Sequence, residues 1–189
     1  MSINLQKGQK VNLEKNGQSV QKFVVGMGWD VNETDSGQGF DLDASAFMLA
    51  ENGKVLTSNH FIFYNNLTSP EGCAEHTGDN LTGAGDGDDE SIKIDLTKAP
   101  ANLASITFVV TIHDAENRRQ NFGQVKNAFV RVYDPTGNEE ILKFDLGEDF
   151  SIETAVEFGK IYKKDGQWKF EAIGTGFAGG LQKFVDKYC

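Results

Sequence analysis

Apolar and polar residues alternate along most of this chain with a period of two, which is typical of β-strands whose two faces meet different surroundings. The alternating runs are short, and turn-forming residues stand between them. They predict strands within residues 3–13 (two short ones), 22–30, 40–49, 61–66, 91–96, 106–113, 128–133, 141–146, 154–163 and 167–174. About ten short strands separated by turns predict an all-β fold, and specifically an antiparallel β-sandwich.

The strand predicted at 40–49 separates two kinds of side chain. Asp41, Asp43 and Ser45 fall on one face, and the apolar residues that alternate with them fall on the other. A rigid element therefore directs two carboxylates to the same side of the fold.

Helical periodicity is confined to the C-terminal end. Leu181, Phe184, Val185 and Tyr188 follow the spacing i, i+3, i+4, i+7, which predicts a short helix packed on the sandwich. A helix is also an alternative for residues 151–162. Their β-branched content and the Asp-Gly turn signal that follows favour a strand and a hairpin there.

The length and composition indicate one globular domain over residues 1–189. Fourteen Phe residues provide a large area for burial, which argues against disorder. No run of about 18 apolar residues could span a bilayer, and the first residues lack the apolar core of a signal peptide. Cys73 and Cys189 suggest no disulfide framework, so we expect a cytoplasmic protein.

Negative charge is concentrated in one part of the chain. The whole chain has a net charge of −10, yet residues 28–90 hold 13 acidic residues and one basic residue, Lys54. This segment is therefore −12, and bound cations would offset its self-repulsion. Nucleic acid is excluded as a partner, because a phosphate-binding face needs concentrated Lys and Arg.

The charge is densest between residues 79 and 90, a segment without Lys or Arg. Glycines at 78, 83, 85 and 87 allow its backbone to take left-handed turns. Ca²⁺ takes about six to eight oxygen ligands, and a flexible chain rich in carboxylates can supply them. The alternative is a solvated acidic loop. The five carboxylates of this acidic loop are Asp79, Asp86, Asp88, Asp89 and Glu90.

Loops gather at the two ends of a β-sandwich. The segment before residue 40, the loop after residue 66 and the acidic loop can therefore meet at one end. The residues that we expect to join the acidic loop there are Asp30, Asp41, Asp43 and Asn66.

Six motifs then occur in order along nearly the whole chain. They are Gly28-Trp-Asp30, Phe40-Asp-Leu-Asp-Ala-Ser-Ala46, Phe61-Ile-Phe-Tyr-Asn-Asn66, His76-Thr-Gly-Asp-Asn80, Gly85-Asp-Gly-Asp-Asp-Glu90, and Gly159 with the segment Trp168–Gly174. Together they resemble the TerD family of tellurium-resistance and stress-response proteins.

This resemblance implies a β-sandwich, calcium in the acidic loops and cytoplasmic residence in bacteria. It also implies a place in tellurite, phage and colicin resistance, together with a membrane partner that would hold the protein at the inner membrane. We expect two adjacent calcium sites. The matching positions for the metal are Asp30, Asp41, Asp43, Asn66, Asp79, Asp86, Asp88, Asp89 and Glu90.

Other metal sites fit the sequence less well. An EF-hand counted from Asp86 would need Gly at Ser91 and an acid at Thr97. A metal-dependent phosphoesterase is an alternative because Thr77-Gly-Asp-Asn80 is similar to its ligand motif. Such enzymes need several His ligands, and the three His here form no His-x-His pair. Few N and S donors disfavour zinc, whereas magnesium stays open.

Three further features have a functional and a structural interpretation. His113-Asp114 could be a general base with its carboxylate, but a strand-end His with a polar partner is the simpler view. Cys73 could be a thiol nucleophile, but it lacks a basic neighbour that would lower its pKa, so we expect it to be a bystander. For Arg118-Arg119 we favour a structural salt bridge over a ligand site.

The sequence therefore predicts a calcium-binding stress-response module and not an enzyme. Metal would order the acidic segment so that the ordered end presents a surface to a protein partner. The remaining alternative is an interaction protein that works without metal.

Overall fold

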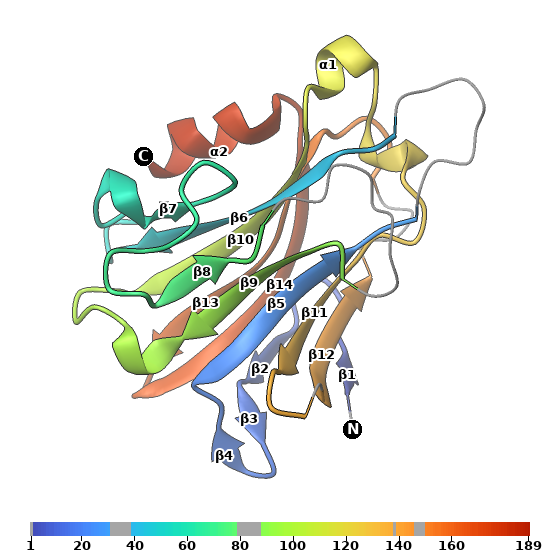
Figure 1. Ribbon diagram of the computed structural model, residues 1–189. Helices are drawn as coiled ribbons and strands as arrows, with labels where there is room; N and C mark the ends of the chain where they lie inside the picture. Colours follow the sequence, from blue (N-terminus) through green and yellow to red (C-terminus); the bar gives the residue numbers. More distant parts are fainter. Residues whose placement is uncertain (1, 31–38, 79–87, 138, 146–149) are drawn as a thin grey trace.

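The computed structural model is a sandwich of two six-stranded sheets, here called sheet A and sheet B (Figure 1). It describes residues 2–30, 39–78, 88–137, 139–145 and 150–189. Sheet A has the order β1 (Ile3–Asn4), β12 (Glu139–Asp145), β11 (Phe129–Asp134), β5 (Lys22–Gly28), β9 (Glu90–Asp95) and β8 (Ala74–His76). Sheet B has the order β2 (Lys10–Asn12), β14 (Gln167–Phe177), β13 (Ala155–Lys164), β10 (Ser105–Ile112), β6 (Leu42–Leu49) and β7 (Phe61–Ile62).

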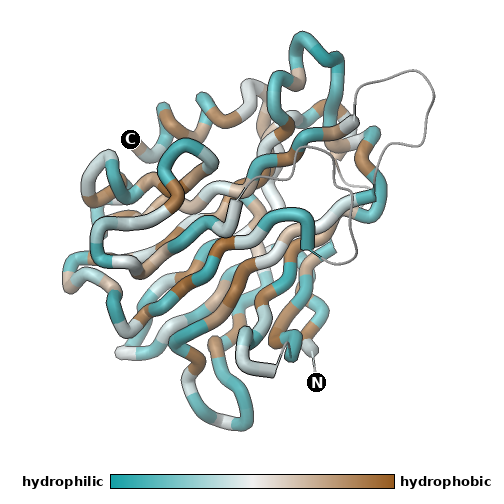
Figure 2. Tube along the Cα trace, viewed as in Figure 1, coloured by the Kyte–Doolittle hydropathy of each residue, from teal (hydrophilic) through white to brown (hydrophobic). Residues whose placement is uncertain are grey.

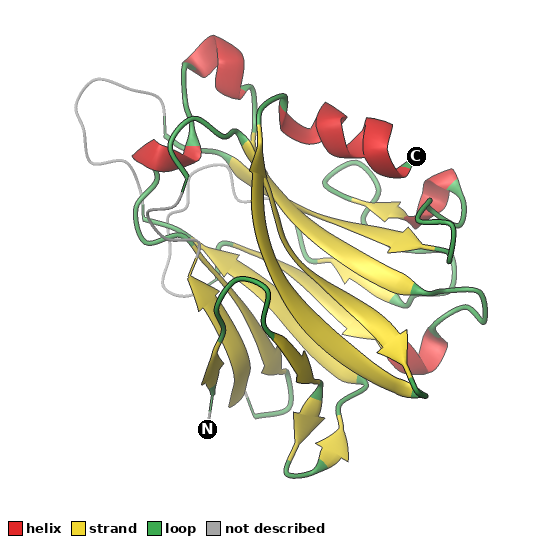
Figure 3. Cartoon of the chain, turned by 180° about the vertical axis from the view of Figure 1, so that it is seen from behind, coloured by secondary structure: helices red, strands yellow, loops and turns green. Residues whose placement is uncertain are grey.

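The remaining elements are small. A hairpin of β3 (Glu14–Lys15) and β4 (Gln18–Ser19) extends from one end of the sandwich (Figure 1). The helices α1 (Ala115–Arg118) and α2 (Gly180–Tyr188) lie at the periphery when the molecule is seen from behind (Figure 3). Short 3₁₀ turns span Ser58–His60, Leu96–Lys98 and Phe122–Gln124. The predicted all-β sandwich is confirmed, and β1 pairs with β12 in parallel within an otherwise antiparallel arrangement of the described strands.

The alternation predicted from the sequence separates the core from the outer faces. On β6, Leu42, Ala44 and Ala46 belong to the core between the sheets, whereas Phe47 joins a second apolar cluster on the other face. The hydropathy of the trace alternates along the strands in the same way (Figure 2). Asp43 therefore points away from the main core, as the pattern at 40–49 predicts.

Helix α2 covers part of the outer face of sheet B. Phe184 and Tyr188 pack there against Phe47, Leu49 and Val109. Phe184 is fully buried, and burial of such a side chain stabilises the fold by about 1.5–3 kcal/mol. The prediction of a short C-terminal helix packed on the sandwich is confirmed.

The strand predicted at 61–66 is wrong beyond Ile62. Phe63 and Asn66 instead exchange backbone hydrogen bonds of 3.1 and 2.9 Å, which close a turn. Asn-Asn at the end of the segment favours such a turn over a continued strand. Phe61 and Phe63 share one face, as residues two apart do in a strand, and their rings stack at 4.3 Å. This pattern resembles a longer strand up to the turn.

The strand predicted at 154–163 is confirmed as β13 (Ala155–Lys164), and the alternative helix at 151–162 is wrong. Strands β13 and β14 form a hairpin around Asp165 and Gly166, which have φ angles of 53° and 77°. These positive angles suit the two-residue turn that the Asp-Gly pair predicts. Helix α1 was not predicted, because four residues are too short for an apolar period.

Candidate functional site

The predicted metal ligands within the described residues come from four places in the fold. Asp30 follows β5, Asp41 and Asp43 belong to the β6 region, Asn66 follows β7, and Asp88 to Glu90 lead into β9. Asp79 and Asp86 lie outside the described residues.

Asp88 lies on the outer face of sheet A against an arginine. Nε and one terminal nitrogen of Arg131 donate to the two Asp88 oxygens at 2.7 and 3.1 Å, and the Asp88 side chain is only 8% exposed. Arg131 stands directly across from Gly26 in the pairing of β11 with β5. A Cβ atom at Gly26 would lie 2.1 Å from an Asp88 oxygen, so only glycine leaves room for this carboxylate.

Asp89 turns toward the end of β5. Its Oδ2 atom accepts a hydrogen bond of 2.9 Å from the Trp29 backbone N–H. Burial raises the pKa of Asp89, the charges of Asp88 and Asp30 add to this, and the Trp29 hydrogen bond acts in the opposite direction. Asp30 itself accepts a hydrogen bond of 2.5 Å from the Asn127 amide. Asp89 therefore lies close enough to Asp88 and to Asp30 for both charges to act on it.

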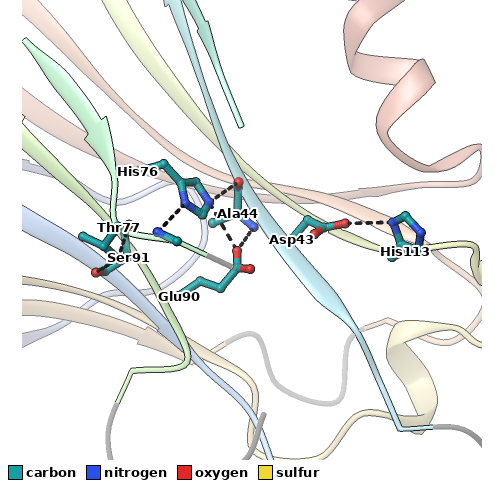
Figure 4. A network of polar contacts seen from close by, with 8 residues as sticks. Asp43, Ala44, His76, Thr77, Glu90, Ser91 and His113 are labelled. Atoms are coloured by element: carbon teal, nitrogen blue, oxygen red, sulfur yellow. Dashed lines mark hydrogen bonds and ion pairs between the residues drawn. The ribbon is translucent and has the colours of Figure 1, made fainter. Parts of the chain in front are cut away.

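Glu90 points into the sandwich and joins the two sheets (Figure 4). Its Oε2 atom accepts a hydrogen bond of 2.6 Å from the Ala44 N–H on β6. Strand β7 pairs with β6 only at Ala46 and Phe47, so side chains satisfy the backbone of β6 beyond the end of β7.

His76 completes this contact from β8. Its Nδ1 atom accepts from the Gly78 N–H at 3.1 Å, so the Nε2 atom carries the proton. Nε2 donates to the Ala44 carbonyl at 3.2 Å and lies 3.5 Å from Glu90 Oε2 (Figure 4). The carboxylate and the imidazole thus replace a missing neighbouring strand at Ala44.

Asp41 and Asp43 lie on the other side of β6. Asp43 Oδ2 is 3.5 Å from His113 Nδ1, and Figure 4 shows this side chain pointing away from Glu90. Asp41 Oδ2 is 3.5 Å from a terminal nitrogen of Arg118. Both carboxylates are buried at the end of sheet B, and each lies beside a basic side chain. The salt bridge that we favoured for Arg118 is confirmed.

Two other residues occupy structural positions. The Asn66 amide donates to the Phe61 carbonyl at 2.7 Å and so holds its own turn. Asp114 accepts from Asn117 at 2.6 Å, so the carboxylate that faces His113 is Asp43 and not its sequence neighbour.

Cys73 is buried, and burial raises its pKa to about 12. A thiol with such a pKa stays protonated near neutral pH, so it is a weak nucleophile.

Sequence reasoning missed two residues that hold the acids, Arg131 and His76. The signal for Arg131 was available, because it alternates with Val130 and Val132 and must therefore face outward. Its pairing with Asp88 depends on strands that are far apart in the sequence. Within the described ranges, no three His, Cys, Asp or Glu side chains form a group that could hold a metal ion.

Comparisons with known proteins agree with the fold. The chain is 55% identical to general stress protein 16U of Bacillus subtilis and to tellurium resistance protein TerD of Serratia marcescens, each over 188 residues that cover 100% of the chain and 97% of the relative. A crystal structure of a TerD homologue from Streptomyces coelicolor superimposes with a TM-score of 0.73 at 22% identity, over 88% of this chain and 96% of that one. Among the described helices, none has the length and apolar character needed to cross a bilayer.

The family model of the TerD domain matches residues 1–188, which is almost the entire chain. This match and the full-length similarity to the two relatives lead to the same assignment. The chain therefore belongs to the TerD family of tellurium-resistance and stress-response proteins.

Proposed function

We propose that this chain is a calcium-binding module of a stress-response system linked to tellurium resistance, and that it acts by binding rather than by catalysis. The names of its relatives, general stress protein and tellurium resistance protein, support the biological setting. The calcium role is supported by the sequence of the acidic loop and by the charge arrangement at its end.

One observation carries the proposal. Asp89 lies at the end of β5, where burial raises its pKa and the charges of Asp88 and Asp30 raise it further. Neighbouring carboxylates that are all ionised cost free energy unless a cation offsets their charge. Hard oxygen donors of this kind suit calcium, so the chemistry of these side chains fits the ion, and further ligands would have to join the described ones to complete the site.

The described residues that would hold the ion are Asp30 and Asp89, with Asp88 available if it leaves Arg131. Asp79 and Asp86 complete the donor set in our sequence prediction. Bound calcium would supply positive charge and fix the carboxylates in place. The segment of net charge −12 would then be ordered, and this end of the sandwich would form a surface for a protein partner.

Asp41 and Asp43 are further candidates for a second ion. They lie beside Arg118 and His113, so a cation there would compete with these basic groups. We keep two calcium sites as the proposal, with the pair on β6 as the weaker one.

The test is a calorimetric calcium titration of chelator-treated protein, with magnesium as the control ion. We expect saturable calcium binding and a higher melting temperature, because binding to the folded state alone stabilises it by about 2.7 kcal/mol at a hundredfold excess over Kd. The variant Asp30→Asn with Asp89→Asn should lose most of the affinity. Glu75→Gln is the matched control, since Glu75 is an exposed acid that pairs with Lys93.

The outcomes separate the proposal from its two alternatives. The proposal is wrong if the wild type binds no calcium, or if the double variant binds it as well as the wild type. Metal-dependent hydrolysis of phosphoesters by the loaded protein would instead favour an enzyme. A partner that binds equally well in chelator would favour a metal-independent interaction protein.

A further inference from the structure

The Asp88–Arg131 pair is built as a fitted ion pair. The guanidinium uses two of its N–H donors on the two carboxylate oxygens, which is the stronger, bidentate geometry. The Arg131 Cζ atom also lies 4.7 Å from the centre of the Tyr133 ring. The arginine is therefore fixed by its strand, by the carboxylate and by an aromatic ring.

The residue beneath the Asp88–Arg131 pair is also constrained. Gly26 lies under the Asp88 carboxylate and opposite Arg131. Because glycine has no side chain, the carboxylate can lie directly on strand β5 at this point. A salt bridge on an open surface contributes little, but this one is largely shielded, with side-chain exposures of 22% and 8%. The pair is worth more than an ordinary surface contact.

The other two acids of the run use different partners. Asp89 binds the Trp29 N–H, and Glu90 binds the Ala44 N–H, so neither holds a cationic side chain through these bonds. Arg131 thus gives Asp88 the positive charge that a metal ion would bring. A divalent cation on the same carboxylate would lie close to the guanidinium, and the two positive charges would repel each other.

We propose that Arg131 is a built-in counter-ion that competes with calcium for Asp88 and so sets the calcium affinity of the site. This inference rests on the proposed calcium function. Without metal, Arg131 keeps Asp88 paired and the start of β9 in place. With metal on Asp88, Arg131 gives up the carboxylate.

The exchange changes the outer face of sheet A. Arg131 on β11 stands opposite Lys143 on β12 in the pairing of these strands. The Lys143 amine lies 4.8 Å from the centre of the Phe129 ring. A released Arg131 would stand beside Lys143, whose amine lies 2.9 Å from Asp145, as a cation that has lost its own carboxylate. Calcium binding at the end of the sandwich would therefore add one unpaired positive charge to this face.

The first experiment compares calcium affinities by calorimetry in four proteins. Arg131→Gln should bind calcium about tenfold more tightly than the wild type, within the usual range of coupling between two binding events. Arg131→Lys, which keeps the charge but loses the bidentate fork, should lie between them. Lys143→Gln is the matched control for loss of one positive charge on the same face, and it should change the affinity much less.

A double-mutant cycle shows whether Arg131 acts through Asp88. In an Asp88→Asn background, Arg131→Gln should no longer alter the calcium affinity. An equal effect in both backgrounds, or an equal effect of Lys143→Gln, would overturn the inference. If neither the wild type nor any variant binds calcium, the proposed calcium function is wrong. If the wild type binds calcium and Arg131→Gln leaves the affinity unchanged, only the inference about Arg131 is wrong.

A readout on the wild type avoids any variant that folds poorly. The Nε–H resonance of Arg131 should be well resolved and protected from exchange in chelator, because Asp88 accepts this proton. Calcium should shift the resonance and speed its exchange with water. A resonance that stays protected in saturating calcium would show that Arg131 keeps Asp88, and the competition would then be excluded.

Discussion

Two glutamates of this protein are almost equally buried but differ in what they connect. Glu90 is 2% exposed and binds Ala44 on β6 beside His76 on β8, so it links the two sheets. Glu157 is 6% exposed and accepts from the Tyr188 hydroxyl at 2.7 Å and the Lys187 amine at 2.6 Å, both on α2. Burial alone therefore does not tell how much of the fold depends on a carboxylate.

The two glutamates differ in the polar groups that would be left without a partner if the carboxylate were removed. Without Glu90, the Ala44 N–H would stay inside the sandwich without its acceptor, and His76 would lose a neighbour. Without Glu157, Lys187 is 43% exposed and can be solvated, and the buried group that loses this acceptor is the Tyr188 hydroxyl on the peripheral helix α2. A group that cannot reach water costs free energy when its partner is lost.

The largest effect is expected for Glu90→Ala. We expect the free energy of unfolding to fall by about 3 kcal/mol, since the loss of one partner leaves buried polar groups unpaired. Glu90→Gln should cost less, because its amide oxygen can still accept from Ala44. Urea unfolding in chelator measures both, with Glu75→Gln as an exposed control that should stay within about 0.5 kcal/mol of the wild type. A small loss for Glu90→Ala would remove the contrast with Glu157.

A smaller and more local effect is expected for Glu157→Ala. We expect the opening of α2 to become easier by about 1–2 kcal/mol, because one charged and one neutral hydrogen bond are lost. Hydrogen exchange should then quicken in α2 and at the Val55 amide, which donates to the Tyr188 carbonyl at 2.9 Å. Amides of β10 should change little. Equal acceleration in β10 would mean that α2 and the sandwich unfold together.

The smallest effect is expected at the surface, where Lys15 contacts Asp134 at 2.7 Å. The Lys15 contact, helped by the Thr136 N–H, lowers the pKa of Asp134 to about 2. Because the folded pKa lies below the unfolded value of about 3.9, the stabilisation is present above about pH 4 and is lost as the pH falls toward 2.

Lys15→Met should therefore weaken the dependence of stability on pH in that window and change little near neutrality. Urea midpoints measured between pH 2 and 6 check this expectation. Lys10→Met is the control, since Lys10 makes a looser contact of 3.5 Å with Glu171. A Lys15→Met profile parallel to that of the wild type would show that the pair adds nothing to acid stability.

The sandwich could be predicted because its signal is local. Alternation within each strand determines which side chains enter the core, and the turn signals at Asp165-Gly166 and at 134–137 mark two hairpins that form. The same local view misjudged residues 63–66, where the turn overrides the alternation. Strands of two or three residues, such as β8, carry too little pattern to be seen.

The candidate site was harder to predict from the sequence, because strand pairing determines which groups contact its acidic side chains. The sequence groups Asp41 and Asp43 with the acidic loop, whereas the fold turns them toward Arg118 on α1 and His113 just after β10. It also treats Asp88, Asp89 and Glu90 as equivalent donors. The fold gives each of the three a separate acceptor role, with Arg131, Trp29 and Ala44 as donors.

The edge strands of the sandwich also bear on how the chain folds during synthesis. Ile3 on β1 pairs with Leu142 on β12, and Val11 on β2 pairs with Phe170 on β14. Strands β1 and β2 are therefore made long before their partners β12 and β14, and closing such long loops slows folding. Until β12 and β14 are made, the backbone groups of β1 and β2 lack these partners and are available for pairing with other chains. Conditions that slow or interrupt translation would prolong this exposed stage, so a stress-response protein of this topology is itself vulnerable while it is being made.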